Sequence, residues 1–112
     1  MVRIEIVESL FEEIEKRFQK ESTKVFDLIE SLKDNPLKGK NLGHVGGIVI
    51  KELKYKTYRF YFIADGFKIK CFDHNRLMDL LLLFVRMSDK KHQQKTIDDI
   101  KLILKTIGPR GL

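Results

Sequence analysis

The chain has 112 residues, of which 43% are hydrophobic and 34% are charged. This composition indicates a globular protein with its own core rather than a disordered tail, and the length fits one domain over residues 1–112. The longest apolar run, residues 80–85, is far shorter than the roughly 20 residues of a membrane helix, and the N-terminus has no signal-peptide pattern. Cys71 is the one cysteine, which excludes an internal disulfide. We therefore expect a cytoplasmic protein that does not enter a membrane.

The net charge of +6 is unevenly distributed along the chain. Residues 1–35 hold 6 basic and 9 acidic side chains, whereas residues 36–95 hold 13 basic and 5 acidic ones. A basic segment of this kind suits a face that binds a polyanion, because neutralised phosphates release condensed counterions. Charge alone is equally consistent with a role in solubility.

The N-terminal third is predicted to form a strand and then a helical hairpin. Residues 2–7 alternate between apolar and polar side chains until the last step, which is typical of a strand. The apolar residues of 7–18 then follow helical spacing, with glutamates near the positive end of the helix dipole. Ser22 or Thr23 is expected to cap a second helix, which carries apolar residues from Val25 to Leu32 and ends at Asn35-Pro36.

The middle of the chain is predicted to form a sheet. Residues 36–47 are rich in glycine and lysine and are expected to be a loop, before strands at 48–55 and 57–64. Asp65-Gly66 is a strong hairpin signal and predicts a further strand over 67–72, in which lysines alternate with Phe67, Ile69 and Cys71. Residues 73–79 fit either a loop or one helical turn.

The last third is predicted to contain a central strand and a helix. Residues 80–87 are almost entirely apolar, which favours a strand, although periodicity alone also allows a buried helix. Apolar residues from Ile97 to Ile107 share one helical face, and Gly108-Pro109 supplies a stop. The sequence therefore predicts an α+β fold, in which an antiparallel four- to five-stranded sheet has an N-terminal helical hairpin and a C-terminal helix packed on one face.

Several kinds of site are excluded by the residues present. The candidate metal ligands have no close ligand spacing, and no local motif for Ser-His-Asp or Cys-His hydrolysis occurs. No glycine pattern opens a helix in the way that a phosphate-binding loop requires. We therefore expect neither a metal ion nor a cofactor. The candidate metal ligands are His44, His74, His92 and Cys71.

What remains is a set of cations that the predicted sheet would position. One group lies on the first hairpin and its turn, and the other lies at the end of the last strand and in the loop after it. A rigid strand end followed by an exposed basic loop suits a phosphate site, whereas Lys68 and Lys70 are explained more simply as protection of a sheet edge. Arg59 stands out because desolvating an idle guanidinium in an aromatic strand would be costly. The two groups are Lys51, Lys54, Lys56 and Arg59, and Arg86, Lys90, Lys91 and His92.

These cations belong to three short motifs, which are Lys51-Glu52-Leu53-Lys54, Tyr58-Arg59-Phe60-Tyr61-Phe62, and Leu83-Phe84-Val85-Arg86 with Lys90-Lys91. Their order and spacing resemble the RelE/ParE toxin superfamily, most of all its HigB branch with phage-related members. The resemblance covers most of the chain and is strongest over residues 48–107. It implies a RelE-like toxin of a toxin–antitoxin pair, which cuts mRNA on the ribosome without a metal and is held inactive by a cognate antitoxin.

The same resemblance implies that Arg59 contacts the scissile phosphate. Cleavage through the 2′-hydroxyl needs a base, an acid and cations that stabilise the developing charge. Histidine titrates near neutral pH, so His92 is the candidate acid or base, and Asp89 can orient it or cap the final helix. The other residues expected at the catalytic site are Arg86, Lys90 and Lys91, and those expected to bind RNA are Lys51, Lys54 and Lys56.

Two departures from the family pattern keep other interpretations open. Ile50 and Glu52 stand where RelE itself has lysines, and a late tyrosine of some members is missing. The chain is alternatively a non-catalytic binding module on the same fold, like the ParE-type relatives that bind DNA gyrase, or a decayed toxin. A generic nucleic-acid binder is the third interpretation. The sequence predicts no oligomeric state.

Overall fold

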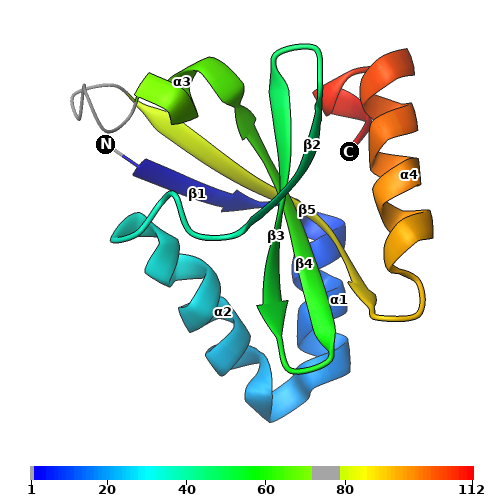
Figure 1. Cartoon of the computed structure of the whole chain (residues 1–112). Helices are drawn as coiled ribbons and strands as arrows, with labels where there is room; N and C mark the ends of the chain where they lie inside the picture. The colour runs from blue at the N-terminus through cyan, green and yellow to red at the C-terminus, as the bar shows by residue number, and fades with distance from the viewer. Residues whose placement is uncertain (1, 72–78) are drawn as a thin grey trace.

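The fold is α+β, and the computed structural model describes residues 2–71 and 79–112. Short 3-10 turns follow α1, α2 and α4, at Gln19–Glu21, Ser31–Lys33 and Pro109–Gly111. No helix of these two ranges is long and apolar enough to cross a lipid bilayer. In chain order the elements are β1 (Val2–Ile6), α1 (Glu8–Phe18), α2 (Ser22–Glu30), β2 (Lys40–Val45), β3 (Ile48–Tyr55), β4 (Tyr58–Asp65), α3 (Gly66–Cys71), β5 (Leu80–Asp89) and α4 (Gln93–Thr106) (Figure 1).

The five strands form one mixed sheet in the order β1-β5-β4-β3-β2. β1 runs parallel to β5, with Val2 beside Leu80 and Ile6 beside Phe84, and the other neighbouring strands are antiparallel. The prediction of a purely antiparallel sheet is therefore wrong for one pair. Alternation within residues 2–6 identifies a strand, but it carries no information on the direction of a partner that follows more than 70 residues later.

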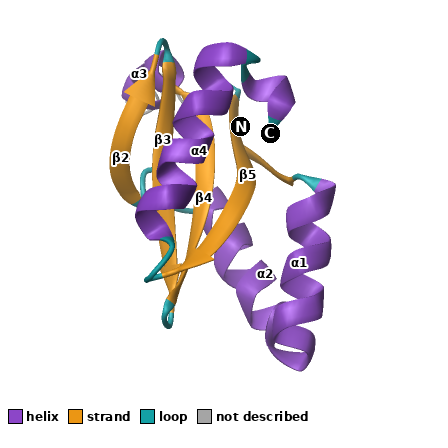
Figure 2. Ribbon diagram, turned by 90° about the vertical axis from the view of Figure 1, so that its right-hand side faces the viewer, coloured by secondary structure: helices purple, strands orange, loops and turns teal. Residues whose placement is uncertain are grey.

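Helices cover both faces of the sheet, so the prediction that they pack on one face is wrong. Figure 2 shows α1 and α2 together on one side of the strands and α4 apart from them. β4 and β5 contribute to both apolar clusters, which explains why their sequences are nearly continuous apolar runs. The buried helix residues are Leu10, Ile14, Val25 and Ile29 in the first cluster, and Ile97, Ile100 and Leu104 in the second.

The hairpin predicted at Asp65-Gly66 is also wrong, because the chain turns there into the short helix α3. Asp65 Oδ1 accepts a hydrogen bond from the Lys68 amide at 3.0 Å, as at a helix start. β4 already has β3 on one side and β5 on the other, so a strand over 67–72 has no free edge of β4 to pair with. Phe67 is consequently 69% exposed. Residue 72 and the segment 73–78, for which a loop or a helical turn was expected, lie outside the described residues.

The segment predicted as a loop over 36–47 contains the strand β2. β2 pairs with β3 across the turn at Gly46-Gly47, with an irregular register between Asn41 and Gly43. A Gly-Gly pair between strand-forming runs is itself a hairpin signal, but the lysine and glycine content of this segment masks it. The pairing places Lys40 beside Glu52 of β3.

The remaining elements agree with the predicted ones to within a few residues. Residues 80–89 form the central strand β5 and not a buried helix. Gly108, with φ of 91°, ends α4 and donates its amide to Ile103 O at 2.9 Å, so the predicted stop is confirmed. The predicted cap of α2 is wrong, since the Ser22 hydroxyl donates to Gln19 O at 2.6 Å instead of accepting from an amide.

Residues 34–39, which precede β2 and which we call the anchored segment, are held to the sheet by two close approaches. Lys51 is 6% exposed and donates from Nζ to Leu37 O at 2.9 Å, and burial lowers the pKa of its ammonium. Gly39 has a φ of +111°, and a Cβ at this position would lie 3.0 Å from the Phe62 ring and 3.1 Å from Glu52 O. Only glycine fits this approach without strain, so the anchored segment holds a defined position beside β3.

Replacement of Gly39 by alanine should therefore destabilise the fold. A side chain at positive φ that also meets the Phe62 ring is expected to lower the free energy of unfolding by about 1–3 kcal/mol. Urea unfolding of Gly39→Ala measures this loss. Gly47→Ala is the matched control, because a Cβ there meets nothing within 4 Å and its φ is not positive. Equal losses in the two variants would show that the close approach at Gly39 contributes nothing.

Candidate functional site

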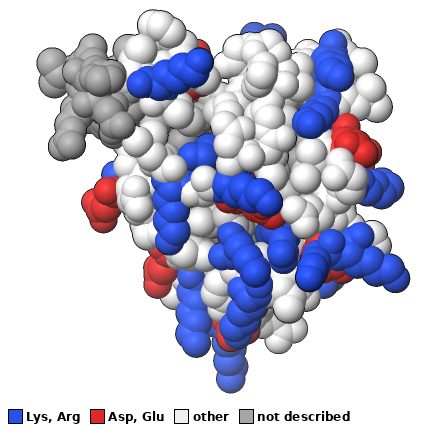
Figure 3. Space-filling model, viewed as in Figure 1, with Lys and Arg blue, Asp and Glu red and all other residues white. Residues whose placement is uncertain are grey.

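A basic cleft lies between the anchored segment, the strands β3 and β4, and the first residue of α4. Its volume is about 540 Å³, and it is open to solvent along the side that carries the lysines. Figure 3 shows Lys and Arg side chains over much of the middle and lower part of this face, with acidic side chains in fewer places. The residues that define the basic cleft are Lys38, Lys40, Glu52, Lys54, Arg59 and Gln93.

Arg59 lies at the base of the cleft and is held by neighbouring groups. It is 9% exposed, its Nε lies 3.2 Å from Glu52 Oε1, and its Nη1 donates to Thr57 O at 3.0 Å. Gln93 Nε2 also donates to Glu52 Oε1 at 3.2 Å, which ties α4 to the pair. The desolvation of the guanidinium is thus offset by an ion pair with Glu52, one of the two positions that depart from the RelE pattern.

The register of the central strands brings separate basic stretches to one end of the sheet. Tyr58 lies beside Asp89, and Arg59 lies beside Ser88, so β5 ends where β4 begins. The exposed Lys90 and Lys91 follow β5 directly and therefore leave the sheet at the end that carries Arg59. The structure thus gathers cations from the anchored segment, from β3 and β4, and from the β5–α4 loop.

Of the eight predicted site residues, two line the basic cleft, namely Lys54 and Arg59. Lys90 and Lys91 lie in the loop after β5 and outside the lining of the cleft, and His92 lines a separate cavity. The other three have structural roles elsewhere. Lys51 is on the opposite face of β3 and anchors Leu37, as described above. The exposed Lys56 forms an ion pair with Glu21 at 2.8 Å, which raises the pKa of Lys56 and lowers that of Glu21. Arg86 donates from Nη1 to Val85 O at 2.7 Å and to Leu112 O at 3.1 Å, so it holds the C-terminal residues against β5.

His92 lines a second cavity of about 250 Å³, which we call the His92 pocket. His92 Nδ1 lies 2.7 Å from Asp89 Oδ1, and this oxygen also accepts the His92 amide at 2.9 Å. These two hydrogen bonds, assisted by the positive charge of Arg17, hold the pKa of Asp89 below its usual value. The contact with Nδ1 orients the imidazole and leaves Nε2 as the ring atom that is free to exchange a proton.

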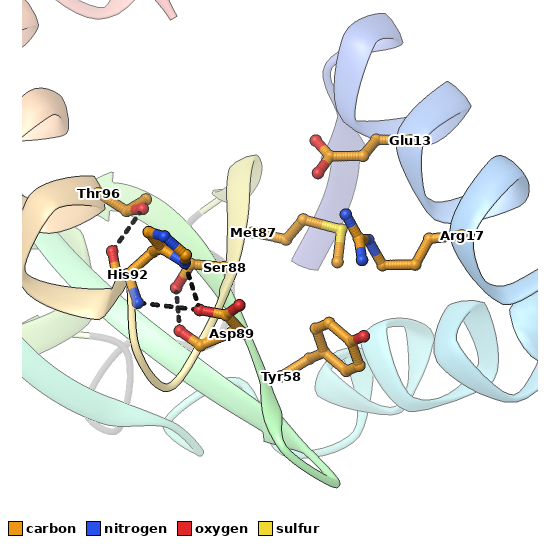
Figure 4. Close-up of a pocket in the computed structure, with 8 residues that line it drawn as sticks. All are labelled: Glu13, Arg17, Tyr58, Met87, Ser88, Asp89, His92 and Thr96. Atoms are coloured by element: carbon orange, nitrogen blue, oxygen red, sulfur yellow. Dashed lines mark hydrogen bonds and ion pairs between the residues drawn. The ribbon is translucent and has the colours of Figure 1, made fainter.

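The opposite wall of the His92 pocket comes from α1 and from the start of β4. Figure 4 shows Glu13 and Arg17 projecting from the helix toward the pocket, with Met87 between the two walls and Tyr58 beneath Arg17. The guanidinium carbon of Arg17 lies 5.6 Å from the centre of the Tyr58 ring, which is a cation–π contact. The pocket therefore combines one aromatic ring, one guanidinium, one imidazole and two carboxylates.

Ser88 lies beside this pocket but is committed to internal hydrogen bonds. Its Oγ lies 2.7 Å from the hydroxyl of Tyr61 and donates to Asp89 O at 2.9 Å. Burial is the main cause that raises the pKa of Tyr61, so this hydroxyl stays protonated and serves the same internal chain. The Ser88 hydroxyl is therefore a structural group, in agreement with the absence of a hydrolase motif in the sequence.

Several residues of the two cavities were not predicted from the sequence. Lys38 and Lys40 lie in the segment expected to be a plain loop, and the one signal the sequence offers for them is the pair of lysines on either side of Gly39. Gln93 and the α1 residues Glu13 and Arg17 had no comparable signal. The spacing of Glu13 and Arg17 predicts only that they lie on the solvent-exposed face of a helix. The neighbouring residues in the sequence do not indicate that this face borders the end of β5.

In residues 2–71 and 79–112, no three His, Cys, Asp or Glu side chains are grouped so that they could hold a metal ion. Comparisons with family models, with curated proteins and with solved structures found no match to this chain. A functional proposal therefore depends on the geometry of the basic cleft and the His92 pocket, together with the motifs of the sequence.

The ion pair at the base of the cleft should be important for stability. Arg59→Met leaves the Glu52 carboxylate uncompensated and is expected to lower the free energy of unfolding by about 3 kcal/mol. Adding Glu52→Gln to this variant should restore most of that loss, because no unpaired charge remains. A double-mutant cycle in urea measures the coupling. Losses that simply add in the double variant would show that the two side chains do not stabilise each other.

The contact between His92 and Asp89 should be visible in the titration of the carboxylate. In His92→Ala the pKa of Asp89 is expected to rise part of the way to its unfolded value, as followed by carboxyl ¹³C NMR, while Lys91→Ala leaves it unchanged. Because the folded-state pKa is the lower one, the contact stabilises the native state above about pH 4 and loses this effect as the pH falls. An unchanged pKa in His92→Ala would contradict the contact.

Proposed function

We propose that this chain is a toxin of the RelE/ParE kind, which binds mRNA in the basic cleft and cuts it on the ribosome without a metal ion. The observation that carries the proposal is the gathering of cations from three separate stretches of chain at one end of the sheet. Such an arrangement suits a phosphodiester backbone, which proteins hold mainly through lysine and arginine. As for related toxins, we propose a cytoplasmic role and a cognate antitoxin that inhibits the chain.

The two cavities are placed so that one RNA strand can meet both. Gln93 lines the basic cleft, and its chain neighbour His92 lines the His92 pocket. Lys54 and the donors of Arg59 that Glu52 and Thr57 leave free can hold phosphate oxygens in the cleft. The exposed Lys90 and Lys91 add positive charge to the loop beside it. These cations supply the electrostatic stabilisation of a pentacovalent phosphate.

Cleavage through the 2′-hydroxyl also needs proton transfer, and His92 is the group that can provide it. The 2′-hydroxyl attacks the adjacent phosphate while a base takes the proton of the hydroxyl. The 5′-oxygen of the next nucleotide then leaves with a proton from an acid. The Asp89 contact at Nδ1 presents Nε2 for one of these transfers. Asp89 therefore acts as the group that positions the imidazole.

The alternative function, a non-catalytic binding module on the same fold, is favoured by one specific observation. The Arg59 guanidinium is paired with Glu52, and both side chains are almost buried, so the arginine that the resemblance places at the scissile phosphate is partly neutralised. A phosphate that approaches Arg59 must compete with this carboxylate. A chain that binds its partner through the exposed lysines alone, without cutting, would not need Arg59 to reach a phosphate.

Mapping of cleavage sites on a translated mRNA distinguishes the two functions. The wild-type chain should cut the message, and His92→Ala should cut it roughly 10²- to 10⁴-fold more slowly while folding normally, because a positioned acid or base contributes about this factor. Lys105→Gln, at the far end of α4 from the cleft, is the control and should cut at the wild-type rate. An intact message with the wild-type protein would reject the endonuclease.

Binding of a short single-stranded RNA tests the cleft itself. Lys54→Gln should weaken binding to all sequences alike and lower the slope of log affinity against log salt by about one. The same measurement on Lys105→Gln corrects for the general loss of a positive charge. RNA binding of this kind without cleavage would select the non-catalytic function, and equal slopes in both variants would reject the basic cleft as the binding site.

A further inference from the structure

The geometry points to the His92 pocket as a binding site for one nucleobase, stacked on Tyr58 and Arg17 and read along its amino-bearing edge by the Glu13 carboxylate. This inference rests on the proposed function, in which the ligand is RNA, and it adds a base preference to it. Guanine should fit best, because it presents two adjacent N–H donors to one carboxylate, and uracil should fit least well.

The pocket holds two flat groups on which a base can stack, the Tyr58 ring and the Arg17 guanidinium. Nucleobases stack on tyrosine rings and on arginine guanidinium planes, and the guanidinium carbon of Arg17 already lies 5.6 Å from the centre of the Tyr58 ring. A base that enters between the two must lift the guanidinium slightly. Arg17 is exposed and lies in the last turn of α1, so its side chain has room for this movement.

The charged groups of α1 are open to a ligand. Within residues 2–71 and 79–112, neither Glu13 nor Arg17 forms an ion pair, although they lie four residues apart on one helix face where such pairs usually form. Arg59 shows the contrast, since its Nε is bound to Glu52. In Figure 4 both α1 side chains reach over the pocket, so their donors and acceptors face the space that a base would fill.

The mixture of charges suits a base better than a phosphate. The carboxylates of Glu13 and Asp89 counter the positive charge of Arg17 in the pocket, whereas the basic cleft on the other side of His92 offers several cations to a phosphate. The volume of about 250 Å³ lies below the roughly 300–1,000 Å³ of sites for drug-sized ligands, which suits a single base. On the wall opposite α1, Ser88 and Thr96 are bound to neighbouring groups, and the Nε2 atom of His92 is left to meet an edge of the base.

Titration of the whole chain with nucleoside monophosphates tests this assignment. In ¹H–¹⁵N NMR spectra, guanosine monophosphate should shift the amides of Arg17, Tyr58 and His92, uridine monophosphate should do so less, and inorganic phosphate should leave them in place. Tyr58→Leu should weaken guanosine monophosphate binding about five-fold or more, whereas Tyr58→Phe keeps the ring and the affinity. Equal shifts with all nucleotides and with phosphate would overturn the assignment.

Variants of α1 test which group reads the base. Glu13→Gln should remove most of the preference for guanosine over uridine monophosphate while leaving the stacking. Arg17→Gln should weaken nucleotide binding more than Arg110→Gln, an exposed arginine outside both cavities. An unchanged preference in Glu13→Gln, or equal losses in the two arginine variants, would contradict the assigned roles.

Binding of RNA oligomers shows whether the pocket takes a base within RNA or only a free nucleotide. It also distinguishes failure of this inference from failure of the proposed function. A single guanosine in an oligouridine should raise affinity several-fold for the wild-type chain and not for Tyr58→Leu. If guanosine monophosphate binds but the oligomer gains nothing, the RNA part of the inference is overturned. Guanosine binding by a chain that cuts no message would refute the endonuclease alone, and cleavage unaffected by Tyr58→Leu at every base would refute this site alone.

Discussion

Burial of the two central strands on both faces is the constraint on which the rest of the structure depends. β4 and β5 lie between the helical hairpin on one side and α4 on the other, so each polar side chain that is buried on them needs a partner inside the protein. Tyr61 meets Ser88 of the neighbouring strand, and Arg59 meets Glu52. The ion pair is thus a consequence of the layered architecture, and it decides how much positive charge the base of the cleft can offer.

The same constraint divides the cations of the chain into those that hold the structure together and those that are open to a ligand. Lys51 and Arg86 point toward backbone carbonyl groups and hold segments in place, and the ammonium of Lys56 is paired with Glu21. The available charge lies at the rim of the cleft, on Lys54 and Lys40 of the sheet and on Lys38 beside it. Only glycine fits at position 39, and this close approach keeps Lys38 and Lys40 at that rim. Positive charge at the cleft is therefore held by the sheet and by the segment anchored to it.

The end of β5 links the two cavities. β5 ends beside the start of β4, and the chain then turns into α4. The two consecutive residues His92 and Gln93 therefore line different cavities. The basic cleft is rich in cations, and the His92 pocket combines an aromatic ring with groups of both charges. Under the proposed function this division matches the two parts of a nucleotide, with the phosphate in the basic cleft and the base beside His92.

The sequence by itself determined the elements whose signals are local. These signals depend on residues a few positions apart, and they comprise the helical spacing, the alternation of residues 2–6, the β3–β4 hairpin and the stop at Gly108. The sequence also indicated that the Arg59 guanidinium would be costly to desolvate within an aromatic strand. Only the tertiary structure decided the parallel pairing of β1 with β5 and the placement of helices on both faces of the sheet. It also decided the helix that begins at Gly66, the strand within the glycine-rich segment, and the positions of Glu52 and Arg17 at the candidate sites. The physical reason is that periodicity reports which side of an element is buried, whereas its partner depends on which sheet edges remain free and which distant charge can offset a desolvated one.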